Sequence, residues 1–297
     1  MPALTPSPVD SDALMAPPPE HALDLQPDAP RLRDSFGRAL TDLRISVTDR
    51  CNYKCVYCRT GNEGAQFTEL PIADYLRMVR LFVSLGIEKV RLTGGEPLLR
   101  SGLVEMVAEL AQLRTAFQPD GTPYATGEQR RPLDIALTTN GHLLESLAAP
   151  LKAAGLTRIT VSMDAVDPET FARITRVPRS FDRVLAGVRA AQAAGLGPIK
   201  INCVLLRGFN DSQIESFAEF SRREGVIVRF IEWMPLEEPS SSPGSRPCCP
   251  LPAFRASRRT SATSSIGSKG LAMYPSTPTD APRSRSIGVQ ALTMAIG

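Results

Sequence analysis

Residues 44–58 read RISVTDRCNYKCVYC, so a β-branched apolar run leads directly into three closely spaced cysteines. The run predicts a strand over 43–48, which places the cysteines in the loop just after the carboxyl end of that strand. Similar runs predict five further strands, at 89–93, 133–138, 158–163, 199–206 and 226–233. Helical patterns lie between the strands at 72–85, 103–110, 181–194 and 211–223, and several helical stretches end at a glycine.

Strands that alternate with helices predict an α/β fold with a parallel sheet, and six such units fit an incomplete (βα)6, TIM-like barrel. In barrels of this kind the chemistry gathers at the carboxyl ends of the strands. The polar stretch 118–131, which contains Pro119, Gly121 and Pro123, interrupts the alternation and predicts a surface insertion.

Composition divides the chain of 297 residues into three parts. Residues 1–30 hold no Lys or Arg and many prolines, which predicts a disordered tail rather than a secretory signal or a mitochondrial presequence. Residues 31–236 form the predicted barrel. Residues 237–297 are rich in Ser, Pro, Arg and Thr without periodicity, and they predict a second disordered tail of low complexity. The net charge of +3, without a clustered basic face or a membrane-length apolar run, indicates a cytoplasmic protein that binds neither nucleic acid nor membranes.

Three of the six cysteines, Cys51, Cys55 and Cys58, share the loop after the first predicted strand. In a cytoplasmic chain such cysteines are more often metal ligands or redox groups than disulfides. Zinc would need a fourth ligand, which Cys203 could supply although it lies inside a predicted strand. Three thiolates alone suit a [4Fe–4S] cluster that leaves one iron open to a small molecule. A loop that binds zinc adventitiously, or binds no metal, is the third alternative.

The C-x3-C-x2-C spacing, with Tyr57 before the last cysteine, resembles the signature of the radical S-adenosylmethionine (SAM) superfamily. Residues 93–97, TGGEP, are similar to the Gly-Gly-Glu-Pro loop of that superfamily and follow one βα unit later. The resemblance implies that Cys51, Cys55 and Cys58 ligate a [4Fe–4S] cluster, whose fourth iron is chelated by the methionine group of SAM.

Further segments extend the resemblance to the GTP 3′,8-cyclase family and together cover about 31–236. These segments are 32–38, 43–48, 90–98, 137–141, 159–165, 199–204 and 228–235. By this resemblance four residues match contacts with SAM: Tyr57, Gly95, Ser162 and Met234. Four others match contacts with GTP: Arg44, Arg91, Thr138 and Lys200. No individual catalytic residue follows from the resemblance.

The cations among these positions also make chemical sense without the resemblance. Arg44, Arg91 and Lys200 lie within predicted strands and can point into a barrel, where an unpaired charge is costly. A triphosphate would neutralise them through charged hydrogen bonds. Pairing with an acid inside the barrel is the alternative, and the candidates are Asp49, Asp134, Asp164 and Glu96.

The family resemblance implies the conversion of GTP to 3′,8-cyclo-7,8-dihydro-GTP, the first step of molybdenum cofactor biosynthesis. It also implies a low-potential electron donor, a cyclic pyranopterin synthase as the enzyme that follows, and a homodimer as one assembly. Two alternatives remain: another radical SAM enzyme, such as a peptide-modifying maturase, and a non-catalytic iron–sulfur or SAM-binding remnant.

The resemblance ends near residue 236. Family members continue with a second cluster, held by a C-x2-C pair and a later cysteine, whereas Cys248 and Cys249 are adjacent here. Our hypothesis is a shift of reading frame near 236–239, because GC-rich genes read out of frame encode Arg, Pro, Ser and Ala. A splice variant or a divergent isoform is the alternative. We therefore expect one cluster and SAM binding, with little or no cyclase activity.

Overall fold

A parallel sheet of six strands in chain order forms the centre of the molecule. The computed structural model describes residues 31–58, 64–233 and 291–294. The parallel strands are β1 (Asp42–Ser46), β2 (Lys89–Thr93), β3 (Asp134–Thr139), β4 (Arg158–Ser162), β5 (Lys200–Leu205) and β6 (Ile227–Glu232). Their order β1 to β6 confirms the predicted α/β class and the incomplete barrel of six units, with strand ends within two residues of those expected.

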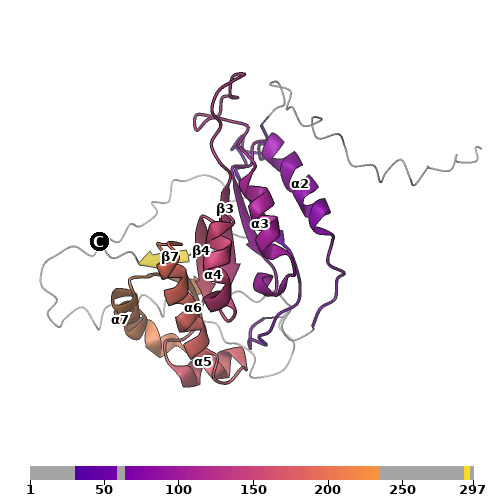
Figure 1. The fold of residues 1–297 in the computed structure, drawn as a ribbon. Helices are drawn as coiled ribbons and strands as arrows, with labels where there is room; N and C mark the ends of the chain where they lie inside the picture. Colours follow the sequence, from indigo (N-terminus) through magenta and orange to yellow (C-terminus); the bar gives the residue numbers. More distant parts are fainter. Residues whose placement is uncertain (1–30, 59–63, 234–290, 295–297) are drawn as a thin grey trace, which may run out of the picture.

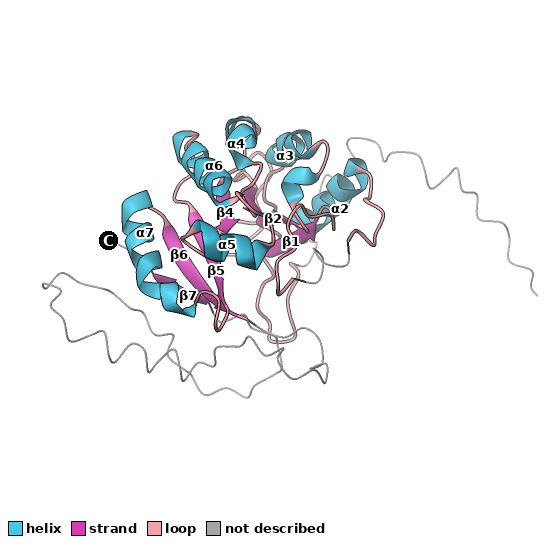
Figure 2. Ribbon diagram, turned by 90° about the horizontal axis from the view of Figure 1, so that it is seen from below, coloured by secondary structure: helices cyan, strands magenta, loops and turns pink. Residues whose placement is uncertain are grey.

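Helices connect successive strands and lie along one side of the curved sheet (Figures 1 and 2). They are α2 (Ile72–Ser84), α3 (Leu103–Ala111), α4 (Leu144–Ala153), α5 (Pro168–Thr175), α6 (Phe181–Ala193) and α7 (Ile214–Glu224), with short 3-10 turns η1 (Pro97–Leu99) and η2 (Asp211–Gln213). The helix predicted over 211–223 is therefore split into η2 and α7. None of the helices within the described ranges is long and apolar enough to cross a bilayer.

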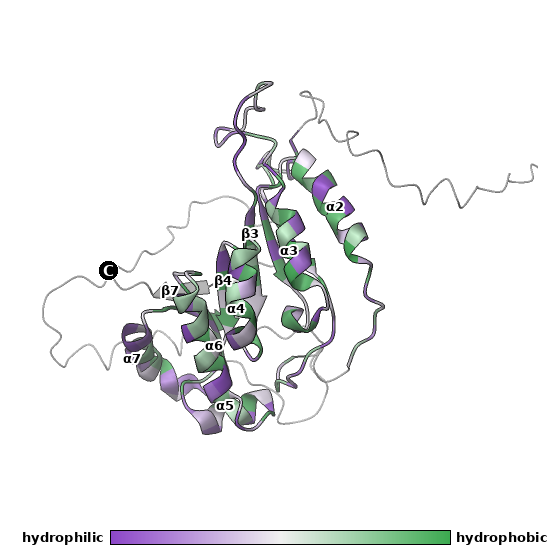
Figure 3. Cartoon of the chain, viewed as in Figure 1, coloured by the Kyte–Doolittle hydropathy of each residue, from purple (hydrophilic) through white to green (hydrophobic). Residues whose placement is uncertain are grey.

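Alternation along the strands separates an apolar face from a polar face. Every second strand residue is fully or nearly fully buried in the core: Ile45, Val90, Leu92, Ile135, Leu137, Ile159, Val161, Ile201, Cys203, Val228 and Phe230. The helices match this face with amphipathic sequences (Figure 3); in α2, for example, Leu76, Val79 and Val83 are buried. The residues between the buried ones form the opposite face of the sheet and, apart from Ala136, are polar or charged.

A seventh strand, β7 (Ala291–Met294), pairs antiparallel with β6 at the edge of the sheet. No regular element was predicted in 237–297. The described part of that segment, residues 291–294, differs from this expectation because it forms a strand. Residues 1–30, and all of 237–297 except β7, lie outside the described residues. The proposed boundaries of the three parts of the chain stay predictions.

The insertion at 118–131 is a largely exposed loop, as predicted. Two isolated antiparallel bridges close it, between Arg114 and Pro132 and between Phe117 and Pro123. It is anchored through Glu88, which forms ion pairs with Arg131 at 3.3 Å and with Arg31 at 2.6 Å.

Candidate active site

The cysteine loop begins directly after β1, at the carboxyl end of the strand. The end of α5 holds the backbone of this loop. Lys54 N–H donates to the carbonyl oxygen of Thr175 (3.1 Å), and Val56 N–H donates to that of Ile174 (2.9 Å). Within the loop, Cys58 N–H donates to the carbonyl oxygen of Cys55 at 3.0 Å and closes a turn. A loop held at several backbone positions presents its side chains in a defined arrangement.

The three cysteines of this loop are half-buried and none is in a disulfide within the described residues. Burial raises the pKa of the Cys51 and Cys55 thiols, and for both thiols the nearby negative charge of Cys58 adds to the effect. The cysteines are thus close enough to affect one another's ionisation. A cation bound among them would stabilise the thiolates and release their protons.

The donor set fits a [4Fe–4S] cluster. Within the described ranges, no three His, Cys, Asp or Glu side chains converge as ligands of one metal ion. The fit rests on the chemistry of the donors: three thiols in one loop are the type of ligand that a [4Fe–4S] cluster takes, each on a different iron. Cys203, the fourth zinc ligand considered above, is fully buried in β5, where its Sγ lies 3.8 Å from the carbonyl oxygen of Asp164. It packs in the core, as a buried cysteine commonly does.

The Gly-Gly-Glu-Pro loop lies against the start of the cysteine loop. Gly95 N–H donates to the carbonyl oxygen of Thr48, and Glu96 N–H donates to that of Arg50, both at 2.7 Å. A Cβ at Gly95 would lie 2.3 Å from the carbonyl oxygen of Arg50, so a larger residue would push the two loops apart. Gly95, a predicted SAM contact, therefore allows the backbone of its loop to lie directly against the backbone at Arg50.

Glu96 is a buried structural link rather than a partner of the barrel arginines. Its carboxylate accepts hydrogen bonds from Thr139 Oγ1 (2.6 Å) and from the backbone N–H groups of Asn140 (2.6 Å) and Leu98 (3.0 Å). Burial raises the pKa of Glu96, and these three donors oppose that shift. The loops after β2 and β3 are thereby joined at the edge where the cysteines lie.

The loop after β4 is joined to the same edge through Tyr57. The Tyr57 hydroxyl donates to Asp164 Oδ2 at 2.6 Å, and Val204 N–H donates to Asp164 Oδ1 at 2.8 Å. Burial raises the pKa of Asp164 to about 6. Tyr57 and Gly95 thus lie in the loops that follow β1 and β2, and Ser162 is the last residue of β4. The fourth predicted SAM contact, Met234, lies outside the described residues.

The four predicted GTP contacts lie on the polar face of the sheet. Arg44 and Arg91 are neighbours in the β1–β2 register, and Arg91 Nη1 donates to Thr138 Oγ1 at 3.3 Å. Burial lowers the pKa of Arg91, and Arg44 and Arg158 lower it further through repulsion. Burial also lowers the pKa of Lys200, together with the charges of Arg229, Arg158 and Arg91. The structure therefore brings these cations into one electrostatic cluster.

Pairing of these cations with the candidate acids is not found. Asp49 accepts backbone N–H groups, Asp164 accepts from Tyr57 and Val204, and Asp134 pairs with Arg158. In the described ranges, no acid forms an ion pair with Arg44, Arg91 or Lys200. The alternative of internal ion pairs is therefore wrong for these three cations in the structure, and an excess of positive charge remains on the polar face.

Arg229 of β6 belongs to the same cationic cluster and was missed by the sequence analysis. Its Nη2 donates to Asn202 Oδ1 at 2.6 Å, while its Nε is buried without a partner in the described part of the chain. Burial lowers the pKa of Arg229, and Arg91 adds to the shift. The alternation of β6 could have revealed it, since Arg229 lies between the buried Val228 and Phe230.

The parallel partial barrel and the three-cysteine loop define a class of protein, and a comparison with protein families identifies the same class. A family model described as the Radical SAM superfamily matches residues 45–221, more than half of the chain. The chain therefore belongs to the radical SAM superfamily, whose members use a [4Fe–4S] cluster and SAM.

Similar curated proteins are GTP 3′,8-cyclases. The one from Acidothermus cellulolyticus is 49% identical over 210 residues, which are 68% of this chain and 54% of that protein. The one from Paenarthrobacter nicotinovorans is 44% identical over 211 residues, covering 69% of this chain and 54% of that protein. The chain spans about half the length of the curated relatives it matches.

Solved structures share the fold at low sequence identity. A radical SAM methyltransferase from Sphaerobacter thermophilus superposes with a TM-score of 0.54 at 17% identity, covering 76% of this chain and 67% of that one. The structure of anSMEcpe with bound AdoMet and a peptide gives a TM-score of 0.52 at 19% identity, covering 70% and 54% of the two chains. These neighbours support the partial-barrel architecture.

Proposed function

We propose that this chain carries the SAM- and GTP-binding barrel of a GTP 3′,8-cyclase. The observation that carries the proposal is the cluster of unneutralised cations on the polar face of the same barrel that presents the cysteine loop. Arg91 is repelled by Arg44, and Lys200 by Arg91. None of the three cations has an ion-paired acid in the described part of the chain, so a polyanion such as a triphosphate is the ligand that would stabilise them best. The identity of 40–49% with curated cyclases supports the same ligand.

In this proposal Cys51, Cys55 and Cys58 hold the [4Fe–4S] cluster, and Tyr57, Gly95, Ser162 and Met234 contact SAM. When bound, the cluster and SAM would supply the radical chemistry that joins ribose C3′ of GTP to C8 of its guanine. The residues of the chain bind and orient. Arg44, Arg91 and Lys200 hold the triphosphate, Thr138 accepts from Arg91 and fixes its direction, and the packed barrel excludes water.

The remaining parts of the proposal rest on the family resemblance. They are a low-potential electron donor, a cyclic pyranopterin synthase as the following enzyme, a homodimer and a cytoplasmic location. We propose that this chain binds SAM and the triphosphate.

Anaerobic reconstitution of the 297-residue chain, followed by reduction with SAM and with or without GTP, tests the proposal. We expect about four irons per chain and release of 5′-deoxyadenosine, with tighter binding of GTP than of guanosine. About eight irons would mean that cysteines of 237–297, or Cys203, ligate a second cluster. Iron without 5′-deoxyadenosine would indicate the non-catalytic binder, and equal affinity for GTP and guanosine would contradict the triphosphate site.

A further inference from the structure

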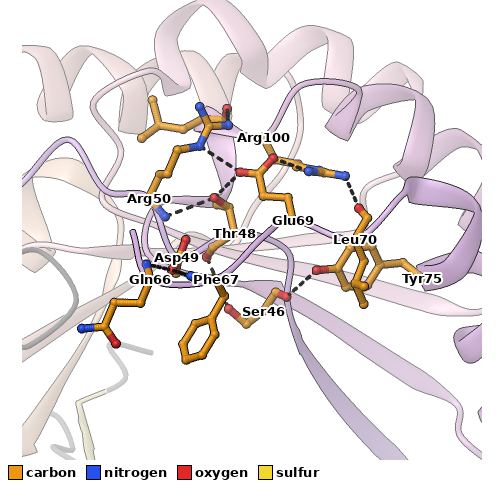
Figure 4. Close-up of polar contacts among 11 residues, drawn as sticks. Ser46, Thr48, Asp49, Arg50, Gln66, Phe67, Glu69, Leu70, Tyr75 and Arg100 are labelled. Carbon is orange, nitrogen blue, oxygen red and sulfur yellow. Dashed lines mark hydrogen bonds and ion pairs between the residues drawn. The ribbon is translucent and has the colours of Figure 1, made fainter. Parts of the chain in front are cut away.

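Two carboxylates join the flanks of the cysteine loop (Figure 4). Before the loop, Asp49 Oδ2 accepts hydrogen bonds from the backbone N–H groups of Gln66 (2.5 Å) and Phe67 (2.7 Å), which follow the loop. After the loop, Glu69 reaches back to the residues that precede it. The chain therefore leaves β1, passes through the cysteines and returns to its own starting point.

Glu69 contacts three residues in two separate segments. Its Oε1 accepts from Thr48 Oγ1 at 2.5 Å and from Arg50 Nε at 2.9 Å, and its Oε2 forms an ion pair with Arg100. Thr48 lies just past the end of β1, Arg50 directly precedes Cys51, and Arg100 follows the turn η1 after the Gly-Gly-Glu-Pro loop. One carboxylate thus connects the entrance of the cysteine loop with the segment that continues from the predicted SAM-binding loop.

The arginines of this cluster reinforce the connection through the backbone. Arg100 Nη2 donates to the carbonyl oxygen of Leu70 at 2.5 Å, and Arg50 Nη2 donates to that of Leu99 at 3.2 Å. The backbone of Arg50 is engaged as well, because its carbonyl oxygen accepts from Glu96 N–H at 2.7 Å. A displacement of Arg50 would therefore shift Cys51 and the Gly-Gly-Glu-Pro loop together.

Glu69 is ionised under all ordinary conditions. The hydrogen bond from Thr48, followed by those from Arg100 and Arg50, lowers the pKa of Glu69 to about 2. The side chain of Arg100 is 10% exposed and that of Glu69 21% exposed, so this ion pair is shielded from solvent more than a typical surface pair.

We propose that Glu69 is a positioning residue for the cysteine loop, which holds Arg50 and the following Cys51 in register with the Gly-Gly-Glu-Pro loop. This inference rests on the proposed function, because it requires that the cysteine loop binds a cluster. Glu69 acts through Thr48, Arg50 and Arg100 rather than by contact with the cluster. Residues that orient metal ligands from outside typically change metal affinity or activity about 10- to 100-fold when removed.

The test compares Glu69→Ala with Glu69→Gln and with Glu109→Ala in the full chain after anaerobic reconstitution. Glu109 is a matched control, because it is an exposed glutamate whose pair with Arg80 spans 4.0 Å. The first readout is the rate at which a chelator removes iron. We expect loss about 10-fold faster in Glu69→Ala, an intermediate rate in Glu69→Gln, whose amide oxygen still accepts from Thr48, and no change in Glu109→Ala.

The second readout is the electron paramagnetic resonance spectrum of the reduced cluster before and after SAM is added. A positioning role predicts that the spectral change caused by SAM is altered in Glu69→Ala at a temperature where circular dichroism shows it folded. If Glu69→Ala only lowers the melting temperature, with a normal chelation rate and spectrum, the inference is overturned while the proposed function stands. If the unsubstituted chain binds no cluster, both are overturned. Should Glu69→Ala fail to fold, Glu69→Gln decides by the same two readouts.

Discussion

The cysteine loop and the cationic face of the sheet satisfy their charges in opposite ways. Around the loop, the carboxylates of Asp49, Glu69 and Glu96 are each met by several donors from the chain itself. On the cationic face, Arg44, Arg91 and Lys200 have no ion-paired acid among the described residues, and neighbouring cations repel Arg91 and Lys200. The carboxylates beside the loop are thus satisfied by donors of the chain itself, whereas the cations of the polar face have no neutralising acid in the described part of the chain.

This difference between the two regions reflects the different requirements of holding a cluster and of binding an anion. Atoms that must hold a cluster in one geometry gain from a rigid surrounding that is already hydrogen-bonded. A surface that must bind and release a polyanion keeps unpaired charge, which lowers the stability of the empty protein and raises its affinity for the ligand. Substitutions in the two regions should therefore affect stability and binding in different proportions.

Removal of a cysteine should give the largest effect. We expect Cys55→Ala to abolish cluster assembly, because two thiolates cannot replace the three-point attachment. Iron and sulfide per chain after reconstitution measure this directly. Cys203→Ser is the matched control and should retain the iron of the unsubstituted chain, since Cys203 packs in the core. Full iron content in Cys55→Ala would contradict the assignment of the ligands.

Loss of a cation should separate binding from stability. We expect Arg91→Leu to weaken GTP binding about 10- to 100-fold, since a charged hydrogen bond contributes roughly 1.5–3 kcal/mol. The same substitution removes repulsion with Arg44 and Arg158, so the melting temperature of the ligand-free protein should stay the same or rise. Isothermal titration with GTP and a thermal melt give the two values, and Arg80→Leu on the exposed side of α2 is the control. A lower melting temperature together with unchanged GTP affinity would show that Arg91 stabilises the fold and does not bind GTP.

The fold could be predicted from sequence because its signals are local and repeated. β-branched runs recur six times, helical patterns lie between them and several of these end at a glycine, so each repeat supports the same parallel arrangement. The order of the strands and the exposed insertion at 118–131 followed from these patterns. The antiparallel strand β7 did not, because four residues in a segment without periodicity carry no signal of their own and depend on the open edge of β6.

The site was predicted less completely, because some of its residues contact partners that are distant in sequence. Cys51, Cys55 and Cys58 share a short motif, so their spacing alone marked them. Arg229 joins the cationic cluster only through the register of β5 and β6, and Glu69 reaches Arg100 across 31 positions. The alternation of β6 places Arg229 on the polar face, but the residues that it meets depend on strand register, and the contact of Glu69 depends on the return of the loop. Neither set of partners appears as a spacing in the sequence.

The contribution of Glu69 to stability should depend on pH. Its folded-state pKa of about 2 lies below the ordinary value of 4.5, so its stabilisation is fully present above about pH 4.5 and is lost as the pH falls towards 2. The difference in melting temperature between the unsubstituted chain and Glu69→Gln should therefore shrink as the pH is lowered through this window. A difference that stays constant from pH 6 to about pH 2 would show that ionisation of Glu69 does not contribute.

The smallest effect should come from an exposed ion pair outside both regions. Arg80 on α2 and Glu109 on α3 approach to 4.0 Å with side chains that are 43% and 59% exposed. Pairs of this kind contribute about 0–1 kcal/mol, because solvent screens them and their long side chains lose entropy when they meet. We expect Glu109→Ala to change the free energy of unfolding by less than about 0.5 kcal/mol in urea titrations. A loss as large as that of Glu69→Ala would mean that burial and hydrogen bonding do not distinguish the glutamate of the cysteine loop from an ordinary surface glutamate.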